Sequence, residues 1–262
     1  SATGGIATAM ALTLLRAFRV HQWTKNGLLL VPLIASHRIF PLDWLPRGLL
    51  ALAAFSLCAS GTYLINDLLD VEADRAHPTK RLRPIAAGTL SPLRAWVLAG
   101  AALLAAFALA LPLGGPFLVT LGGYLALTLG YSLWLKRLVL LDVIVLAALY
   151  SLRVIAGHVV FAIPFSEWLL AFTVFLFLGL ALVKRYGELL LLRESARATT
   201  AGSRRGYDAR DAELVGYLGT SSTFVAVLVF ALYINSSQVR QLYRHPDLLW
   251  LAIPLLLYWL GR

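Results

Sequence analysis

The sequence predicts an all-α protein that crosses a membrane several times. Hydrophobic residues make up 60% of the 262 residues and charged residues only 14%, whereas a soluble domain carries about 25% charged residues. The mean hydropathy is +0.78, and the chain contains several apolar runs of about 20 residues, the length that one helix needs to cross a bilayer core. These observations exclude an ordinary water-soluble fold. They also exclude a disordered chain, which needs low hydrophobicity and many charges.

The charges and the cysteine content narrow the class of protein further. The single cysteine, Cys58, excludes a disulfide framework and a zinc site built on thiolates. The net charge of +10 would suggest a nucleic-acid partner for a soluble protein. In a membrane protein the positions of the charges matter more than their sum, so we expect membrane phospholipid and no nucleic acid as a partner.

Eight apolar runs, separated by turn-forming residues, are the candidate membrane spans. They lie at about residues 20–36, 48–68, 95–113, 116–135, 138–158, 167–184, 214–234 and 248–260. We expect residues 1–15 to be a flexible or engineered N-terminus and residues 16–262 to form a single transmembrane catalytic domain. The last run is barely long enough to span, so we expect a ninth helix to be absent or cut off.

The distribution of Lys and Arg predicts the orientation of the chain. If the N-terminus is cytoplasmic, 18 of the 23 Lys and Arg residues fall on the cytoplasmic side and four fall outside. Cytoplasmic loops carry an excess of these residues. We therefore expect a multi-pass protein of the bacterial plasma (inner) membrane, with cytoplasmic loops at about residues 70–94, 135–138 and 185–213.

The second span ends in a segment rich in acidic residues. Asn66, Asp70 and Asp74 recur every four residues and so lie near one face of a helix. Acidic residues at a helix C-terminus oppose the helix dipole, so local helix stability does not explain them. Oxygen ligands of this kind suit Mg²⁺, which binds one or two carboxylates together with substrate phosphates. We interpret the three residues as catalytic metal ligands rather than as a solvated helix end.

Cations that could bind phosphate occur near the cytoplasmic ends of several spans. Directly after the acidic segment, the loop from His77 to Gly88 crowds three cations into four residues, a composition that can clamp a phosphate or serve as an ordinary positive-inside loop. Arg153 lies too deep in its span to reach water easily, so we expect it to line a cavity. The substrate-binding candidates are Lys25, Asn26, Tyr63, Lys80, Arg81, Arg83, Tyr131, Lys136, Arg153, Lys184, Arg185 and Glu188. Lys184 and Glu188 are also spaced to pair simply with each other.

Several of these motifs resemble a known family. The Asn66-Asp-x-x-Asp70-x-x-x-Asp74 pattern is similar to the first signature of the UbiA-type intramembrane prenyltransferase superfamily, and Tyr131-Ser-Leu-Trp-Leu-Lys136-Arg137 is similar to its Tyr-Thr-x-x-x-Lys-Arg element. The segments that begin at Arg19, Asp74 and Lys184 resemble the decaprenyl-phosphate phosphoribosyltransferase branch. The resemblance covers nearly the whole chain.

The resemblance implies a helical horseshoe, usually of nine helices, around a cavity that opens to the cytoplasm. It implies transfer of a 5-phosphoribosyl group from 5-phosphoribosyl 1-diphosphate to a polyprenyl (decaprenyl) phosphate, with release of diphosphate, for cell-wall arabinan (arabinogalactan) synthesis. Asn66, Asp70 and Asp74 would then hold Mg²⁺ on the diphosphate. The residues expected to contact donor phosphates or ribose are Lys25, Tyr63, Lys80, Lys136, Arg153 and Arg185.

One departure from the family pattern bears on the substrate. Prenyltransferases of this type have a second Asp-x-x-x-Asp motif late in the chain, and Lys184-x-x-x-Glu188 stands in its place here. The cation fits a donor that carries an additional phosphate.

Two alternatives stay open: an aromatic-acceptor prenyltransferase of the same fold, and a non-enzymatic carrier of an anionic metabolite. A homo-oligomer is compatible with the sequence. The segment from Arg193 to Glu213 is a candidate lid that excludes water from the site.

Overall fold

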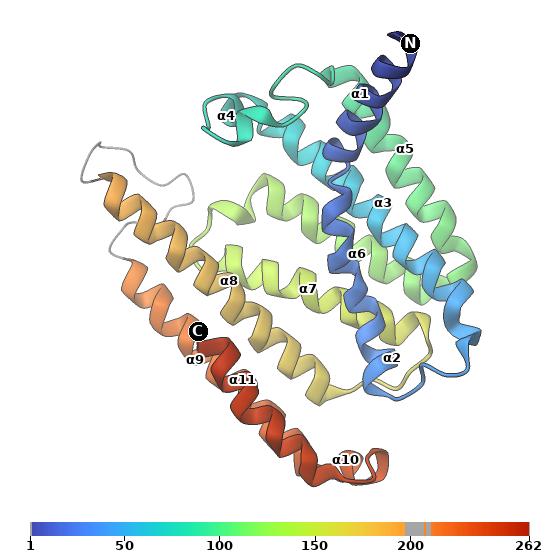
Figure 1. Cartoon of the computed structure of the whole chain (residues 1–262), viewed down its shortest axis with the longest axis vertical. Helices are drawn as coiled ribbons and strands as arrows, with labels where there is room; N and C mark the ends of the chain where they lie inside the picture. Colours follow the sequence, from blue (N-terminus) through green and yellow to red (C-terminus); the bar gives the residue numbers. More distant parts are fainter. Residues whose placement is uncertain (1, 197–206, 208–210, 262) are drawn as a thin grey trace. The chain divides into compact units, whose positions relative to one another are not determined.

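The computed structural model describes residues 2–196, 207 and 211–261. These residues form helices and no strand, which confirms the predicted all-α class (Figure 1). The long helices are α1 (Ala2–Ala17), α3 (Leu45–Leu69), α5 (Pro92–Ala110), α6 (Gly115–Leu133), α7 (Leu141–Val160), α8 (Glu167–Ala196), α9 (Asp211–Ile234) and α11 (Ala252–Gly261). Shorter helical segments are η1 (Val20–Leu30), α2 (Val31–Ala35), η2 (Leu42–Trp44), α4 (Val71–Arg75), η3 (Lys80–Leu82), η4 (Leu111–Leu113), η5 (Leu135–Arg137), α10 (Ser237–Leu242) and η6 (Pro246–Leu251).

The chain divides into two compact units whose segments alternate along the sequence. Unit 1 consists of Ser1–Val31, Ile39–Leu129 and Val159–Ala162. Unit 2 consists of Pro32–Arg38, Gly130–His158 and Ile163–Arg262. The expected single domain of residues 16–262 therefore contains parts of both units.

Small residues pack the helices of unit 1. Helices α3 and α5 lie side by side (Figure 1). Helix α5 buries alanines at positions 95, 99, 102 and 106, a spacing that forms one stripe along a helix. On α3, a Cβ added to Gly61 would lie 3.2 Å from the carbonyl oxygen of Ala99, so the two backbones approach closely. In lipid the hydrophobic effect does not drive helices together, because the lipid tails are as apolar as the side chains. Small residues favour helix association there by allowing close van der Waals packing.

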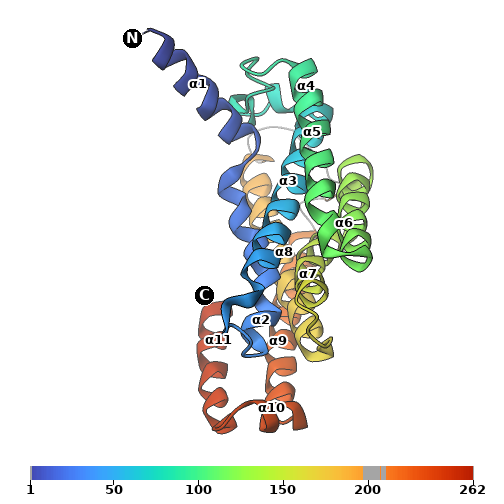
Figure 2. The same cartoon turned by 90° about the vertical axis from the view of Figure 1, so that its right-hand side faces the viewer.

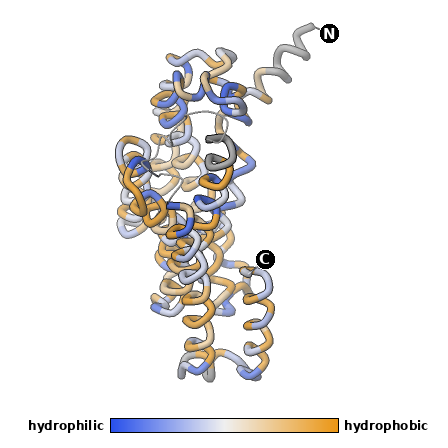
Figure 3. The backbone as a smooth tube through the Cα atoms, turned by 90° about the vertical axis from the view of Figure 1, so that its left-hand side faces the viewer, coloured by the Kyte–Doolittle hydropathy of each residue, from blue (hydrophilic) through white to orange (hydrophobic). Residues whose placement is uncertain are grey.

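Unit 2 is built around the pair α8 and α9. Glycines leave room for close contact between the two helices: a Cβ added to Gly179 of α8 would lie 2.6 Å from the Thr223 hydroxyl of α9. A Cβ added to Gly219 of α9 would lie 3.2 Å from the Cβ of Leu182. Helix α11 runs beside α9 (Figure 2), and hydrophobic positions predominate along the helices that lead to the C-terminus (Figure 3).

Six helical segments among the described residues are long and apolar enough to cross a membrane. They are Leu42–Leu69, Pro92–Leu113, Gly115–Leu133, Leu141–Val160, Glu167–Leu191 and Ala212–Ile234. These correspond to six of the eight predicted spans. The predicted first span is split into η1 and α2. Polar side chains of η1 bond to α3, and α2 begins at Val31 with Pro32 in its first turn. The predicted last span is the 16-residue apolar segment Pro246–Gly261, shorter than the other six.

Other expected segment boundaries also differ from the structure. Residues 2–17, most of which we expected to be flexible or engineered, form helix α1, consistent with the high helix propensity of Ala, Leu and Met. The expected loop at residues 185–213 is partly helical, because α8 continues to Ala196. Most of the candidate lid, residues 197–206 and 208–210, lies outside the described residues.

Candidate functional site

The predicted metal ligands lie where α3 passes into α4. Asp70 separates the two helices, but the Asp70 amide donates to the Asn66 carbonyl at 3.0 Å and the Asp74 amide donates to the Asp70 carbonyl at 2.8 Å. The helical path therefore continues across the junction. As a result the three predicted ligands follow one another at one-turn intervals, as the sequence pattern predicts.

Two partly buried arginines approach this acidic helix end within unit 1 and form an ion cluster with its buried carboxylates. Arg83 donates from one Nη1 to Asp74 at 2.6 Å and to Asp67 at 3.1 Å. Arg19 donates to the same Asp67 oxygen at 2.5 Å, and its guanidinium lies 4.7 Å from the centre of the Tyr63 ring. Only 4% of the Asp67 side chain is exposed. We refer to Arg19, Asp67, Asp74 and Arg83 as the unit 1 cluster.

The loop that carries Arg83 is folded against the end of α3. Ile85 and Leu90 are buried in a core cluster that also contains Leu64 of α3, and the Leu90 amide donates to the Pro84 carbonyl at 3.0 Å. Within the same loop Arg81 is exposed and Lys80 is half-buried. The loop is therefore held by apolar contacts, which leave its cations at or near the surface.

Segment η1 carries two of the predicted substrate-binding residues, Lys25 and Asn26, which differ in burial. Asn26 is buried and donates to the Ser56 hydroxyl of α3 at 3.0 Å, and Trp23 donates to the Ser60 hydroxyl of α3 at 3.0 Å. These bonds fix η1 to α3. Lys25 is half-buried, and its Nζ donates to the side chain of Gln22 at 3.2 Å.

A second buried ion cluster lies in unit 2. Arg185 of α8 donates to Asp142 of α7 at 2.5 Å and also pairs with Glu188. Tyr207 donates its hydroxyl to the other Asp142 oxygen at 2.7 Å, while the Leu140 amide donates to that hydroxyl at 2.8 Å. Burial, followed by the hydrogen bond to Asp142, raises the pKa of Tyr207 to about 12. We refer to Asp142, Arg185, Glu188 and Tyr207 as the unit 2 cluster.

The unit 2 cluster changes the expected pairing on α8. Glu188 pairs with Arg185, and Lys184, its expected partner, is exposed. Arg185 is 4% exposed, and its Nε is one of the buried side-chain atoms without a hydrogen-bond partner in the described part of the chain.

The other predicted substrate-binding residues, Tyr131, Lys136 and Arg153, lie in unit 2. Arg153 is buried on α7, where it donates to the Leu149 carbonyl at 2.6 Å and lies 5.4 Å from the centre of the Tyr150 ring. Tyr131, near the end of α6, and Lys136, in η5, are both half-buried. The predicted residues therefore divide between the two units rather than forming one cluster within either.

Asp67, Arg19 and Tyr207 are among the site residues that are absent from the candidates predicted from the sequence. Asp67 follows Asn66 directly and so falls off the face defined by the four-residue spacing. A carboxylate inside a predicted span was a sufficient signal, because such a group needs a cationic partner. The contact of Tyr207 with Asp142 joins residues 65 positions apart, and no local pattern announces it.

The residues present at the α3–α4 junction fit a divalent cation through their chemistry. No group of three or more His, Cys, Asp or Glu side chains in the described part of the chain is arranged to hold a metal ion by itself. Mg²⁺ does not require such a group, since it commonly binds one or two carboxylates and completes its shell with water and substrate phosphate. Asp70 and Asp74, with the amide oxygen of Asn66, supply donors of that type.

The chain is similar in sequence and in fold to several known proteins. The profile of the UbiA prenyltransferase family matches residues 28–262. An uncharacterized protein y4nM of Sinorhizobium fredii is 39% identical over 95% of this chain, and the chain spans about half (48%) of that relative's length. A decaprenyl-phosphate phosphoribosyltransferase of Mycolicibacterium smegmatis is 36% identical over 88% of this chain and 73% of its own length. A solved UbiA homolog from Archaeoglobus fulgidus, bound to GPP and Mg²⁺, is similar with a TM-score of 0.73 and 19% identity, covering 95% of this chain and 86% of that chain.

Proposed function

We propose that this chain, which belongs to the UbiA prenyltransferase family, is an enzyme that transfers the 5-phosphoribosyl group of 5-phosphoribosyl 1-diphosphate to a polyprenyl phosphate. The observation that carries this proposal is the direct pairing of Arg83 from the basic loop with Asp74 at the acidic helix end. It joins the candidate phosphate-binding loop to the candidate metal ligands within unit 1. The relative named decaprenyl-phosphate phosphoribosyltransferase supports the choice of donor and acceptor.

The reaction makes one bond and breaks one bond at the anomeric carbon of the ribose. An oxygen of the polyprenyl phosphate bonds to this carbon, and the bond from the carbon to the diphosphate oxygen breaks. Positive charge develops on the sugar and negative charge on the diphosphate. A divalent cation, when bound, would neutralise part of the charge on the leaving group.

The chain's own residues position the reactants for this displacement. Asn66, Asp70 and Asp74 would hold the cation, and Lys80 and Arg83 would bind the released phosphates through charge-assisted hydrogen bonds. Arg83 would exchange some of its contact with Asp74 for the donor phosphate. The acceptor phosphate is already anionic at neutral pH, so the reaction needs no strong general base. We propose that the site faces the cytoplasm, where the soluble donor is available.

The first experiment measures diphosphate release by the full chain in lipid nanodiscs. One mixture contains 5-phosphoribosyl 1-diphosphate, a polyprenyl phosphate and Mg²⁺; the matched mixture contains a prenyl diphosphate and an aromatic acid. We expect release only in the first mixture, and we expect its loss on chelation of the metal. Release only in the second mixture would replace the proposal with an aromatic prenyltransferase, and the GPP-bound homolog makes that arm necessary. No release in either mixture would contradict both enzymatic proposals.

A pair of variants tests the proposed metal ligands. Asp70→Asn keeps the side-chain size but removes the charge, and we expect at least about a 100-fold loss of turnover, as found when a group that stabilises transition-state charge is removed. Glu72→Gln is the matched control because Glu72 is an exposed acid on the adjacent turn of α4. Its turnover should stay within about twofold of the wild type. Equal turnover of Asp70→Asn and Glu72→Gln would exclude Asp70 as a ligand.

A further inference from the structure

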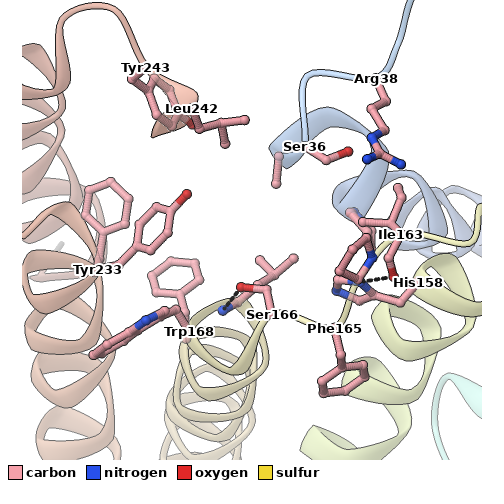
Figure 4. Close-up of a pocket in the computed structure, with 16 residues that line it drawn as sticks. Ser36, Arg38, His158, Ile163, Phe165, Ser166, Trp168, Tyr233, Leu242 and Tyr243 are labelled. Carbon is pink, nitrogen blue, oxygen red and sulfur yellow. Dashed lines mark hydrogen bonds between the residues drawn. The ribbon is translucent and has the colours of Figure 1, made fainter. Parts of the chain in front are cut away.

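A cavity of about 460 Å³ in unit 2 has no lining residue in common with either ion cluster. It is lined by the short helix α2, by the end of α7 and the start of α8, and by the end of α9 and α10 (Figure 4). Its walls are mainly apolar and aromatic. The aromatic lining residues are Phe165, Trp168, Phe172, Phe230, Tyr233 and Tyr243.

The basic side chains of the cavity lie on one side and its two tyrosines on the other. Figure 4 shows Ser36, Arg38 and His158 on the side opposite Tyr233 and Tyr243. His158 is buried, its Nδ1 donates to the Ile163 carbonyl at 3.3 Å, and its ring lies 5.0 Å from that of Phe165. Arg38 is exposed and supplies a permanent positive charge, and none of the lining residues is an Asp or Glu. The cavity therefore combines an apolar wall with a site for one negative charge.

The cavity lies at the far end of the candidate spans from the unit 2 cluster. Trp168 near the start of α8 and Arg185 of the cluster are 17 residues apart on one helix. At a rise of about 1.5 Å per residue this is about 26 Å, close to the thickness of the hydrocarbon core, about 30 Å. Trp and Tyr side chains, which line the cavity, are typical of residues at the membrane–water boundary. The cavity is thus placed at a membrane surface, opposite the surface of the unit 2 cluster.

We propose that this cavity binds an anionic glycerophospholipid of the surrounding membrane. Arg38 pairs with the lipid phosphate, and the aromatic wall receives the first part of an acyl chain. The Ser36 hydroxyl donates to the Leu33 carbonyl at 3.2 Å, so Arg38 supplies the charge-assisted bond to the phosphate. A lining with one arginine and no Asp or Glu suits a head group with one net negative charge better than a zwitterionic one. A volume of about 460 Å³ is within the usual range for ligand sites, about 300–1,000 Å³. The remainder of each chain stays in the bilayer.

The test measures the melting temperature of the purified full chain in detergent during titration with short-chain phosphatidylglycerol or phosphatidylcholine. We expect saturable stabilisation by phosphatidylglycerol, and an apparent Kd at least about 10-fold weaker for phosphatidylcholine, a change equivalent to loss of one charge-assisted bond. Arg38→Gln should weaken phosphatidylglycerol binding by a similar factor. Its melting temperature without lipid should match that of the wild type, because Arg38 is exposed.

Arg244→Gln is the matched control. Arg244 is also exposed and follows Tyr243, a lining residue, but does not itself line the cavity; its variant should bind phosphatidylglycerol as the wild type does. Equal weakening by both variants, or equal binding of the two lipids, would overturn the proposal. Displacement of phosphatidylglycerol by an equimolar polyprenyl phosphate would assign the cavity to the acceptor instead. These results do not depend on turnover, so they stand whatever the outcome for the proposed transfer reaction.

Discussion

At the scale of single residues, the stability of unit 1 depends on Asp67. This buried carboxylate accepts from both Arg19 and Arg83, so Asp67→Asn leaves two partly buried cations short of a counter-charge. We expect the variant to lose about 3 kcal/mol of unfolding free energy, toward the lower end of the range for a broken buried ion pair, because Arg83 keeps Asp74 as a partner. Denaturant unfolding in detergent measures the difference.

The control for Asp67 is an acid of unit 1 that stands outside the cluster. Asp43 is exposed, and Asp43→Asn should change the unfolding free energy by less than about 0.5 kcal/mol, as surface substitutions commonly do. If Asp67→Asn proved equally mild, the two arginines would have to be stabilised by water or lipid phosphate rather than by Asp67.

At the scale of helices, the packing of α8 on α9 depends on the absence of a side chain at Gly179. A Cβ there would lie 2.6 Å from the Thr223 hydroxyl and 3.3 Å from the Thr223 amide nitrogen, so the Thr223 side chain or α9 itself must move to accept Gly179→Ala. We expect a loss of about 1–3 kcal/mol of unfolding free energy, the usual cost of overpacking. Gly187→Ala on the same helix is the control, since a Cβ at Gly187 meets nothing within 4 Å. A destabilisation equal in the two variants would mean that helix propensity, not interhelical contact, is being measured.

The bond between Tyr207 and the start of α7 makes the stability of unit 2 depend on pH. The pKa of Tyr207 is raised from 10.0 to about 12, so folding favours the protonated hydroxyl. Its contribution is complete below about pH 10 and is lost as the pH rises toward 12. Melting temperatures between pH 8 and 11.5 should therefore fall more steeply for the wild type than for Tyr207→Phe. Tyr217→Phe, at an exposed position on α9, should follow the wild type; a wild-type slope for Tyr207→Phe would exclude this linkage.

The same helices show what could and could not be predicted from the sequence. Hydropathy predicted the six long spans because each is a regular helix of at least 19 residues. Hydropathy wrongly predicted one continuous span over η1. A hydropathy average takes no account of hydrogen bonds, and Asn26 and Trp23 bond to serines of α3. The four-residue spacing predicted that Asn66, Asp70 and Asp74 follow one another at one-turn intervals, and the α3–α4 junction has this arrangement. The roles of Asp67 and Tyr207 depend instead on contacts with residues far along the chain. Local periodicity carries no information about such contacts.

At the scale of the whole molecule, the orientation in the membrane is the prediction with the widest consequences. It rests on the excess of Lys and Arg in loops that we assign to the cytoplasm, and it decides which substrate can reach the unit 1 cluster from water. Cys58 is the single cysteine of the sequence and is fully buried. Replacing it by Ser therefore gives a background without a thiol. Two exposed positions in unit 1, Asp43 and Thr79, then report on the two expected surfaces when each is changed singly to Cys.

In intact bacterial cells, a membrane-impermeant maleimide should label Asp43→Cys at once. The same reagent should label Thr79→Cys only after the membrane is permeabilised, because Thr79 lies in the basic loop beside the proposed donor site. The reverse pattern would place Arg83, Asp74 and the donor phosphates on the outer surface, away from the cytoplasmic supply of a soluble phosphorylated donor. The transfer proposal would then fail even if the purified protein bound the donor. Labelling therefore tests the orientation independently of catalysis, and the diphosphate assay tests the chemistry independently of orientation.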